Sequence, residues 1–180
     1  MKLKYLLTAC LCLTLISLAW AESTKDLFDK GNNAYQKGDY TQAAKFMKKI
    51  CNRGDTSGCY NLGVLYRDGK GVKQSYIQAA KLFEKACNNG DLESCSSLGV
   101  AYGKGHGVKQ SDTQAIKLWE KACNGNIAKG CYNLAILYDD AQNIDQNYDI
   151  IAQKYYKKAC ELEHQNACNK YKKTNQKDIQ

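Results

Sequence analysis

The 180-residue sequence lacks proline, contains only two histidines and has no Cys-x-x-Cys pair. A proline inside a helix removes a hydrogen bond and clashes with the preceding turn, so its absence favours continuous helices. His106 and His164 are isolated, whereas a zinc enzyme needs several ligands that converge. We interpret both as solvated loop residues. Without Cys-x-x-Cys, a redox role of the thioredoxin type is also disfavoured.

Long hydrophobic runs are missing as well. Two lysines near the start precede an apolar run at residues 6–18, which is too short to span a bilayer comfortably. A small-x-small site follows at 19–21, so we predict a secretory signal peptide over residues 1–21. A lipoprotein site at Cys10 is the weaker alternative, because too few apolar residues precede it. Cleavage lowers the net charge from +8 to +6, since two lysines leave, and predicts a secreted or periplasmic protein.

The cysteines that remain recur with a fixed spacing. The four pairs are Cys51 and Cys59, Cys87 and Cys95, Cys123 and Cys131, and Cys160 and Cys168. Their first members are 36, 36 and 37 residues apart. The segments NLGVLY, SLGVAY and NLAILY keep the same period. A period of this length indicates stacked helical repeats.

Each cysteine pair encloses seven residues, which suits a structural disulfide better than a metal site. Zinc knuckles usually place two cysteines two to four residues apart. An even number of cysteines in an exported chain is typical of a disulfide framework. We therefore predict one bridge within each pair, with the metal site and the redox pair as weaker alternatives.

One repeat unit reads as two helices. Cys59, Leu62, Gly63 and Tyr66 lie on one helical face, and glycines follow that segment. The Ser-x-x-Gln sequence at 75–78 is typical of the start of a second helix. Each cysteine pair then joins the end of one unit to the start of the next. Closing such a loop is worth about 2.5 kcal/mol on the chain-entropy model.

These observations predict an all-α protein, an α/α solenoid of about eight helices in four hairpins plus a short terminal helix. The predicted repeat domain spans residues 22–172. Its units lie at about 24–54, 55–90, 91–126 and 127–163, followed by a terminal cap at 164–172 and a disordered tail at 173–180. The bridge between Cys160 and Cys168 is the least secure, because its turn contains no glycine.

The GxGVxxS loop, the LGxxY helix and the KAC helix end resemble Sel1-like repeats, which are relatives of tetratricopeptide repeats. With Cys-x7-Cys in every unit and a signal peptide, residues 24–170 are similar to the Helicobacter cysteine-rich protein family. The resemblance implies a right-handed solenoid with one disulfide per unit. It also implies penicillin binding with weak β-lactamase activity, secretion and recognition by the host immune system.

The residues themselves offer no recognised hydrolase machinery. A serine β-lactamase needs Ser-x-x-Lys, and no serine here has a lysine three positions later. The sequences at 111–113 and 173–175 are near misses to two further motifs of that class. We therefore assign no catalytic residue, no metal and no cofactor. Whether the protein is an enzyme stays open, and a slow β-lactamase is what the resemblance implies.

A ligand-binding role follows from the predicted curvature, because solenoids present an extended concave surface. In tetratricopeptide repeats, asparagines on the first helices clamp a peptide backbone or a carboxylate. The candidate ligand-binding residues here are Asn32, Asn61, Ser97, Asn133, Tyr60, Tyr132, Arg67 and Lys129. The alternative is that they are ordinary solvated or half-buried repeat residues.

The predicted partners are a peptide, a protein, a cell-wall fragment or a β-lactam. The alternative function is a non-catalytic protein–protein interaction scaffold or a host-interaction factor. We expect a monomer without a membrane span. Nucleic acid is disfavoured, because the chain is exported and its basic residues are not interleaved with aromatic ones.

Overall fold

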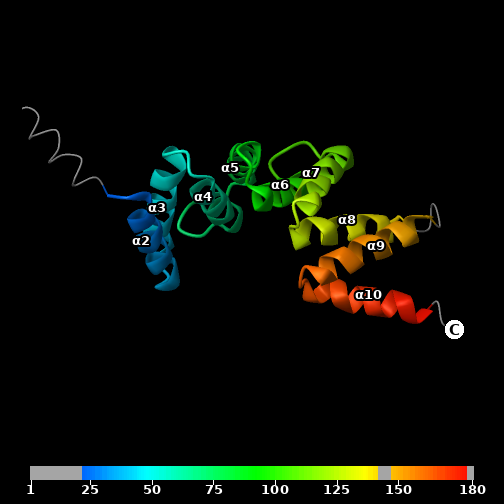
Figure 1. Cartoon of the computed structure of the whole chain (residues 1–180). Coiled ribbons are helices and arrows are strands. Elements are labelled where there is room, and N and C mark those ends of the chain that lie inside the picture. Colours follow the sequence, from blue (N-terminus) through cyan, green and yellow to red (C-terminus); the bar gives the residue numbers. More distant parts are fainter. Residues whose placement is uncertain (1–21, 142–146, 178–180) are drawn as a thin grey trace, which may run out of the picture.

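The computed structural model describes residues 22–141 and 147–177, with side chains up to residue 174. Within these ranges it contains nine helices and no strand (Figure 1). They are α2 (Thr24–Gln36), α3 (Tyr40–Asn52), α4 (Thr56–Asp68), α5 (Tyr76–Asn88), α6 (Leu92–Lys104), α7 (Asp112–Asn124), α8 (Ala128–Asp140), α9 (Asn147–Glu161) and α10 (Gln165–Lys177). The predicted signal peptide lies outside the described residues.

Most helices begin at a polar side chain that accepts a hydrogen bond from a free backbone N–H group. Ser75 and Ser111 cap α5 and α7, as the Ser-x-x-Gln sequences predict. Asp55 and Asp91 cap α4 and α6 in the same way. The start of α8 differs, because the apolar Ile127 precedes it and provides no side-chain cap. Such caps are worth about 1 kcal/mol each.

All four predicted disulfides are present. Their Cα–Cα distances are 4.5, 4.7, 4.6 and 4.5 Å in chain order. The first three bridges are buried, whereas Cys160 and Cys168 are only half-buried. Each bridge joins the last turn of one helix to the first turn of the next. We call each bridge and its turn a staple.

Every staple turn contains one residue with a positive φ angle. Gly54 and Gly90 adopt it at 90° and 93°. Asn126 and Glu163 occupy the corresponding positions of the third and fourth staples, with φ of 63° and 65°. The turn that lacks glycine therefore forms with the same handedness, although side chains other than those of asparagine and aspartate rarely adopt this region.

A second set of glycines shapes the long loops of the two middle units. Gly69 and Gly105 end α4 and α6 in the left-handed conformation, as predicted. Gly71 and Gly107 lie against the backbone at the start of the second helix of the preceding unit. A β-carbon at either position would overlap that backbone, so the loops dock only where glycine is present.

Small residues inside the first helices allow close packing onto the second helices. Gly63 lies against the ring of Phe83, and Gly99 lies against the indole of Trp119. The Trp119 indole N–H donates a hydrogen bond of 3.1 Å to the backbone oxygen of Ser96. In the last unit Ala135 and Tyr156 are both fully buried in the same core cluster. The hydrophobic core is thus a continuous chain of small clusters between successive helices.

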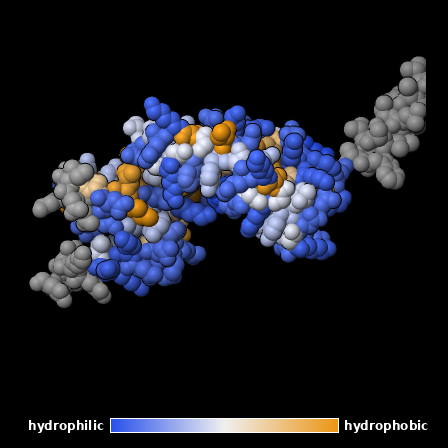
Figure 2. All heavy atoms as spheres, turned by 180° about the vertical axis from the view of Figure 1, so that it is seen from behind, coloured by the Kyte–Doolittle hydropathy of each residue, from blue (hydrophilic) through white to orange (hydrophobic). Residues whose placement is uncertain are grey.

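Successive helices pack against each other along the chain, and α6 also contacts α8. Figure 1 shows them arranged in series, with α2 and α10 at opposite ends. The face seen in Figure 2 is mainly hydrophilic, with separated apolar patches. These features confirm the all-α solenoid with one disulfide per repeat. Helix α10 continues to Lys177, so residues 173–177 are helical where the sequence predicted a disordered tail.

Candidate functional site

The staples fix the positions of three side chains on the first helices of successive units. Tyr60, Ser96 and Tyr132 each directly follow the second cysteine of a staple, on α4, α6 and α8. Because the bridge holds the first turn of each helix, the backbone of these residues has little freedom to move. Tyr60 and Tyr132 also contact the core rings of Phe83 and Tyr156, with centroids 6.0 Å apart in both pairs.

A cavity of about 360 Å³ lies between α4, α6 and α8, closed at its edges by α5 and by the turn before α10. We call it the central cavity. It brings together six of the eight residues proposed from sequence, namely Tyr60, Arg67, Ser97, Lys129, Tyr132 and Asn133. Residues far apart in the chain therefore converge on one hollow, as expected of a binding site rather than of scattered surface groups.

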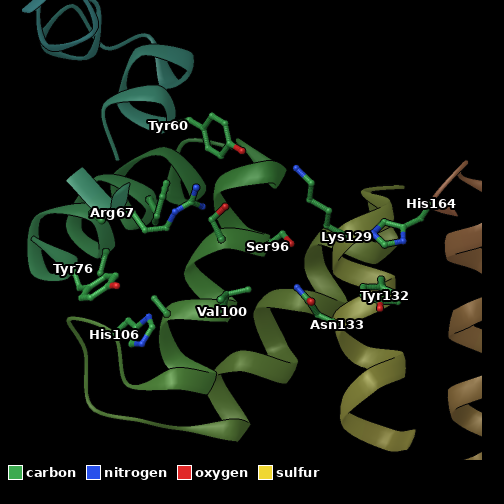
Figure 3. A pocket seen from close by; sticks show the side chains of 15 residues that line it. Tyr60, Arg67, Tyr76, Ser96, Val100, His106, Lys129, Tyr132, Asn133 and His164 are labelled. Carbon is green, nitrogen blue, oxygen red and sulfur yellow. The ribbon is translucent and has the colours of Figure 1, made fainter. Parts of the chain in front are cut away.

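Two stacked tyrosine–histidine pairs border the central cavity. The rings of Tyr76 and His106 lie 4.3 Å apart, and those of Tyr132 and His164 lie 4.2 Å apart. Figure 3 shows one pair on each side of the hollow, with α6 between them. Flat aromatic walls of this kind provide large contact areas for a ligand at little cost in side-chain entropy.

The loop glycines account for the position of His106. Gly107 contacts the backbone of Tyr76, which brings the loop onto the start of α5 and places the imidazole over the tyrosine ring. One unit earlier, Lys70 precedes Gly71 and lies over the ring of Tyr40, at 5.2 Å from its centroid. Docking of the loop is thus a property of the repeat, and the residue before the second glycine decides what is stacked there.

His164 has a structural contact besides its stacking partner. Its Nδ1 accepts a hydrogen bond of 3.3 Å from the backbone N–H of Ala167, which caps the start of α10. Burial lowers the pKa of His164 below its usual range, and the charge of Lys129 lowers it further. The imidazole is therefore neutral at pH 7 and can offer its Nε2–H to a ligand.

Arg67 and Lys129 supply the two formal positive charges of the central cavity at neutral pH. Arg67 donates two hydrogen bonds, of 2.7 and 3.2 Å, to the carboxylate of the adjacent Asp68. This pairing raises the pKa of Arg67 and lowers that of Asp68. Lys129 lies 3.6 Å from the carboxylate of Glu93 and is largely exposed. Both cations can therefore reach a bound anion, but each already has a carboxylate partner.

The remaining two predicted residues, Asn32 and Asn61, lie in a separate hollow of about 330 Å³ between α2 and α4. The side-chain amide of Asn61 donates a hydrogen bond of 2.8 Å to the backbone oxygen of Ser57. Asn61, Ser97 and Asn133 do share one helical position, the sixth in their helices. Asn32 is the ninth residue of α2, where the other units carry Val64, Val100 and Ile136. It is therefore almost one turn out of register with the proposed row.

Sequence reasoning missed the two histidines and Tyr76. His106 and His164 are half-buried and stacked rather than freely solvated. The repeated glycines around His106 were the available signal, because two glycines in a loop of fixed length indicate a close backbone approach. No comparable signal marks His164, since its contact with Tyr132 joins positions 32 residues apart.

The side chains of the central cavity include several groups that can contact a ligand. It offers aromatic faces, amide and hydroxyl groups, and two cations that suit a carboxylate. Within the described residues, neither Ser96 nor Ser97 hydrogen-bonds through its hydroxyl to a histidine or lysine, and no group of metal-binding side chains occurs. In the same ranges no helix is both long and apolar enough to cross a bilayer.

The fold and its cysteines define a class, namely disulfide-stapled α/α solenoids with a ligand-sized hollow on their first helices. The Sel1 repeat family matches the chain four times, at residues 25–55, 56–91, 92–127 and 128–164. This chain therefore belongs to the Sel1 repeat family. The units predicted from sequence begin one residue earlier in each case.

Curated relatives from Helicobacter pylori are similar to part of the chain. "Putative beta-lactamase HcpC" of strain ATCC 700392 / 26695 is 43% identical over 53 residues, which are 29% of this chain and 18% of that protein. "Putative beta-lactamase HcpE" of strain J99 / ATCC 700824 is 35% identical over 71 residues, which are 39% and 20%. These matches support the resemblance to the Helicobacter cysteine-rich proteins. The chain spans about a fifth of the length of the relatives it matches.

Two solved structures share the fold over most of the chain. The c5321 protein of uropathogenic Escherichia coli, described as a protective antigen with an SLR fold, has a TM-score of 0.75 and 28% identity. That match covers 87% of this chain and 34% of c5321. A Sel1 repeat protein from Oxalobacter formigenes has a TM-score of 0.72 and 25% identity, and the match covers 80% and 58% of the two chains.

Proposed function

We propose that this protein is an exported binding module that holds a carboxylate-bearing ligand in the central cavity. The ligand class is a cell-wall peptide fragment or a β-lactam, and any opening of the β-lactam ring is slow. The observation that carries the proposal is the convergence of two aromatic pairs and two cations on one hollow of about 360 Å³.

The site favours a carboxylate over a neutral ligand. Arg67 and Lys129 approach the hollow from different helices, and the neutral His164 can donate a further hydrogen bond. A charge-assisted hydrogen bond is about twice as strong as a neutral one. The names of the Helicobacter pylori relatives connect this architecture with β-lactams, which carry a carboxylate beside a compact ring.

Binding rather than rapid hydrolysis fits the side chains of the cavity. Acylation of a serine needs an adjacent base, and rapid metal-assisted hydrolysis needs several convergent ligands. The central cavity offers Ser96 and Ser97, but within the described residues neither hydroxyl hydrogen-bonds to a histidine or lysine that could act as the base. We therefore expect saturable penicillin binding with a turnover far below that of a dedicated β-lactamase.

The cellular setting of the proposal rests on the disulfides. Four bridges in a small repeat protein are typical of an oxidising compartment, such as the periplasm or the extracellular space. The signal peptide predicted at residues 1–21 would deliver the chain there. We infer that the exported protein acts as a monomer whose groove is held open by the staples, which keeps the ordering cost of binding small.

Fluorescent-penicillin binding and nitrocefin turnover, measured on the same oxidised sample, test this proposal. Lys129→Gln should weaken penicillin binding about tenfold, because a charge-assisted contact is worth roughly 1.5 kcal/mol. Lys81→Gln removes the same charge from the exposed face of α5 and should leave the affinity unchanged. Asn133→Ala should weaken binding more than Asn61→Ala, since only Asn133 lines the central cavity.

Rapid nitrocefin turnover would overturn the binding-module interpretation. The absence of saturable penicillin binding would exclude small carboxylates as the ligand class and leave protein–protein interaction as the alternative function. A pull-down from envelope or host extracts would then be the appropriate next experiment.

A further inference from the structure

A second hollow adjoins the central cavity between α6, α7 and α8. Its volume is about 350 Å³, and we call it the α6–α8 cavity. Val100, Ile136 and Leu137 are among its apolar residues. Asp112, Asp140 and Lys104 are its charged residues. Apart from Val100 and Asn133, which also line the central cavity, its residues have no role in the proposed carboxylate site.

The two cavities have opposite formal charge. The residues that line the central cavity include the cations Arg67 and Lys129 and no carboxylate. The carboxylates that pair with these cations, Asp68 and Glu93, lie outside the lining. The lining of the α6–α8 cavity has two carboxylates and one lysine, a sum of −1. A ligand that extends through both would therefore meet a positive end and a negative end.

Both carboxylates of the α6–α8 cavity, Asp112 and Asp140, are exposed. Among the described residues, neither Asp112 nor Asp140 forms an ion pair or a side-chain hydrogen bond. The neighbouring Asp139 is different, because it accepts hydrogen bonds from Tyr156 and Lys170 at 3.0 and 2.9 Å. Asp139 thus has a structural role. Asp140 forms no such hydrogen bond, although its charge also helps to raise the pKa of Lys170.

The two cavities are adjacent, since Val100 and Asn133 line both of them. Figure 3 shows these two residues at the inner side of the central cavity, on adjacent helices. Beyond them, Ile136 and Leu137 form an apolar wall that leads toward Asp140 on the same helix. An aliphatic chain can lie along such a wall while its charged end reaches the carboxylates.

We propose that the α6–α8 cavity is an ammonium subsite for the ligand whose carboxylate occupies the central cavity. This inference rests on the proposed function and adds the chemical class of the ligand. The ligand is dipolar, with a primary amine on an aliphatic stem and a free carboxylate at the other end. A peptide that carries a lysine-type diamino acid near its carboxyl terminus has this character, as stem peptides of bacterial cell walls do.

The geometry also sets the direction of the bound peptide. Its carboxyl terminus points toward Arg67 and Lys129, and the stem of the diamino residue follows α8 toward Asp140. An ammonium group is a compact point charge with three donors, which two carboxylates and an amide oxygen can satisfy. Lys104 opposes this binding, because it places a like charge in the same hollow.

Calorimetric titration with two synthetic peptides tests the subsite. Nα-acetyl-Lys-D-Ala-D-Ala has a free ε-amine, and its Nα,Nε-diacetyl counterpart does not, while both keep the same carboxylate. We expect the free amine to tighten binding at least fivefold at low salt, and the ratio to shrink as ionic strength rises.

Three variants test whether the ratio of the two peptide affinities depends on the α6–α8 cavity. Asp112→Asn combined with Asp140→Asn should bring the ratio close to one without changing the affinity for the diacetyl peptide. Lys104→Gln should increase the ratio, an effect opposite in sign that general damage to the fold cannot produce. Glu84→Gln removes an exposed carboxylate from α5 and should leave the ratio unchanged.

Equal affinities for the two peptides in the unmodified protein would overturn the ammonium subsite while leaving the carboxylate site in place. Failure of both peptides to bind would overturn the proposed function together with this inference. If the double variant unfolds, Lys104→Gln alone decides, because a ratio that does not rise contradicts the proposal.

Discussion

The staple turns at the two ends of the solenoid have the same geometry but different residues. In the N-terminal half the positive-φ position is Gly54 or Gly90, whereas in the C-terminal half it is Asn126 or Glu163. The bridges close at nearly equal Cα–Cα distances in both halves. The turn therefore forms with or without glycine at this position, and glycine only removes the steric strain of a positive φ.

The contacts that join the helices differ between the middle units and the last unit. In the middle units, Gly71 and Gly107 dock the loop onto the preceding unit, so the backbone itself makes the contact. Among the described residues of the last unit, Asp139 joins α8 to α9 and α10 through hydrogen bonds with Tyr156 and Lys170. The units thus depend on different contacts, and substitutions can separate the contributions of these contacts to stability.

Removal of one staple should have the largest effect and should differ between the halves. Cys87→Ala with Cys95→Ala and Cys160→Ala with Cys168→Ala open loops of equal length, each costing about 2.5 kcal/mol in chain entropy. Cys87 and Cys95 are 1% and 0% exposed, so their loss also leaves a buried void and should cost about 1 kcal/mol more. Urea denaturation of both variants measures the difference, and equal losses would contradict the contrast in burial.

Gly107→Ala should destabilise the protein by about 2–3 kcal/mol, because the new β-carbon meets the backbone of Tyr76 and the φ of 77° is unfavourable for alanine. Gly38→Ala is the matched control, with a φ of 80° and no atom within 4 Å of the new β-carbon. The control should lose only about 1 kcal/mol. Thermal denaturation compares the two variants. Equal melting temperatures would show that docking of the loop contributes nothing to stability.

One substitution in the last staple turn is expected to increase stability. Glu163→Gly should stabilise the protein by up to about 1 kcal/mol, since glycine adopts a positive φ without steric cost. Gly90→Ala at the corresponding position should destabilise it by a similar amount, because nothing else lies within 4 Å of the new β-carbon. Chemical denaturation of both proteins checks the reversal, and a loss in Glu163→Gly would mean that its side chain has an additional role.

The smallest effect concerns pH. The pKa of His164 lies below its usual 6.5 in the folded protein, mainly because the ring is buried and also because Lys129 is nearby. As the pH falls below 6.5, the unfolded chain takes up the proton first, so this contribution to stability is full above 6.5 and declines below it. His164→Asn keeps a helix-capping side chain that does not titrate. The variant should show less acid destabilisation between pH 6.5 and 5, by under about 1 kcal/mol.

The fold could be predicted from the sequence because the period of the repeats specifies it. The cysteine spacing, the Leu-Gly pattern and the Ser-x-x-Gln caps are local signals, and the structure confirms the elements they predict. The bridge between Cys160 and Cys168 also forms, although glycine is absent from its turn.

The site was predictable only in part. Residues such as Asn133 and Tyr132 could be placed because they follow the repeat. The stacking of His106 on Tyr76 and of His164 on Tyr132 joins different units through ring contacts that no local pattern records. Asn32 was wrongly aligned with Asn61. The first unit is four residues shorter than the next, and Gly31 corresponds to Gly63 when their first helices are aligned.

Backbone chemical-shift mapping during titration with benzylpenicillin tests the central claim most directly. The account predicts saturable changes that cluster at the end of α4, along α6, in the first turns of α8 and at His164, with weaker changes in the hollow around Asn32. Changes confined to the outward faces of α3, α7 and α9, or the absence of any saturable change, would contradict it.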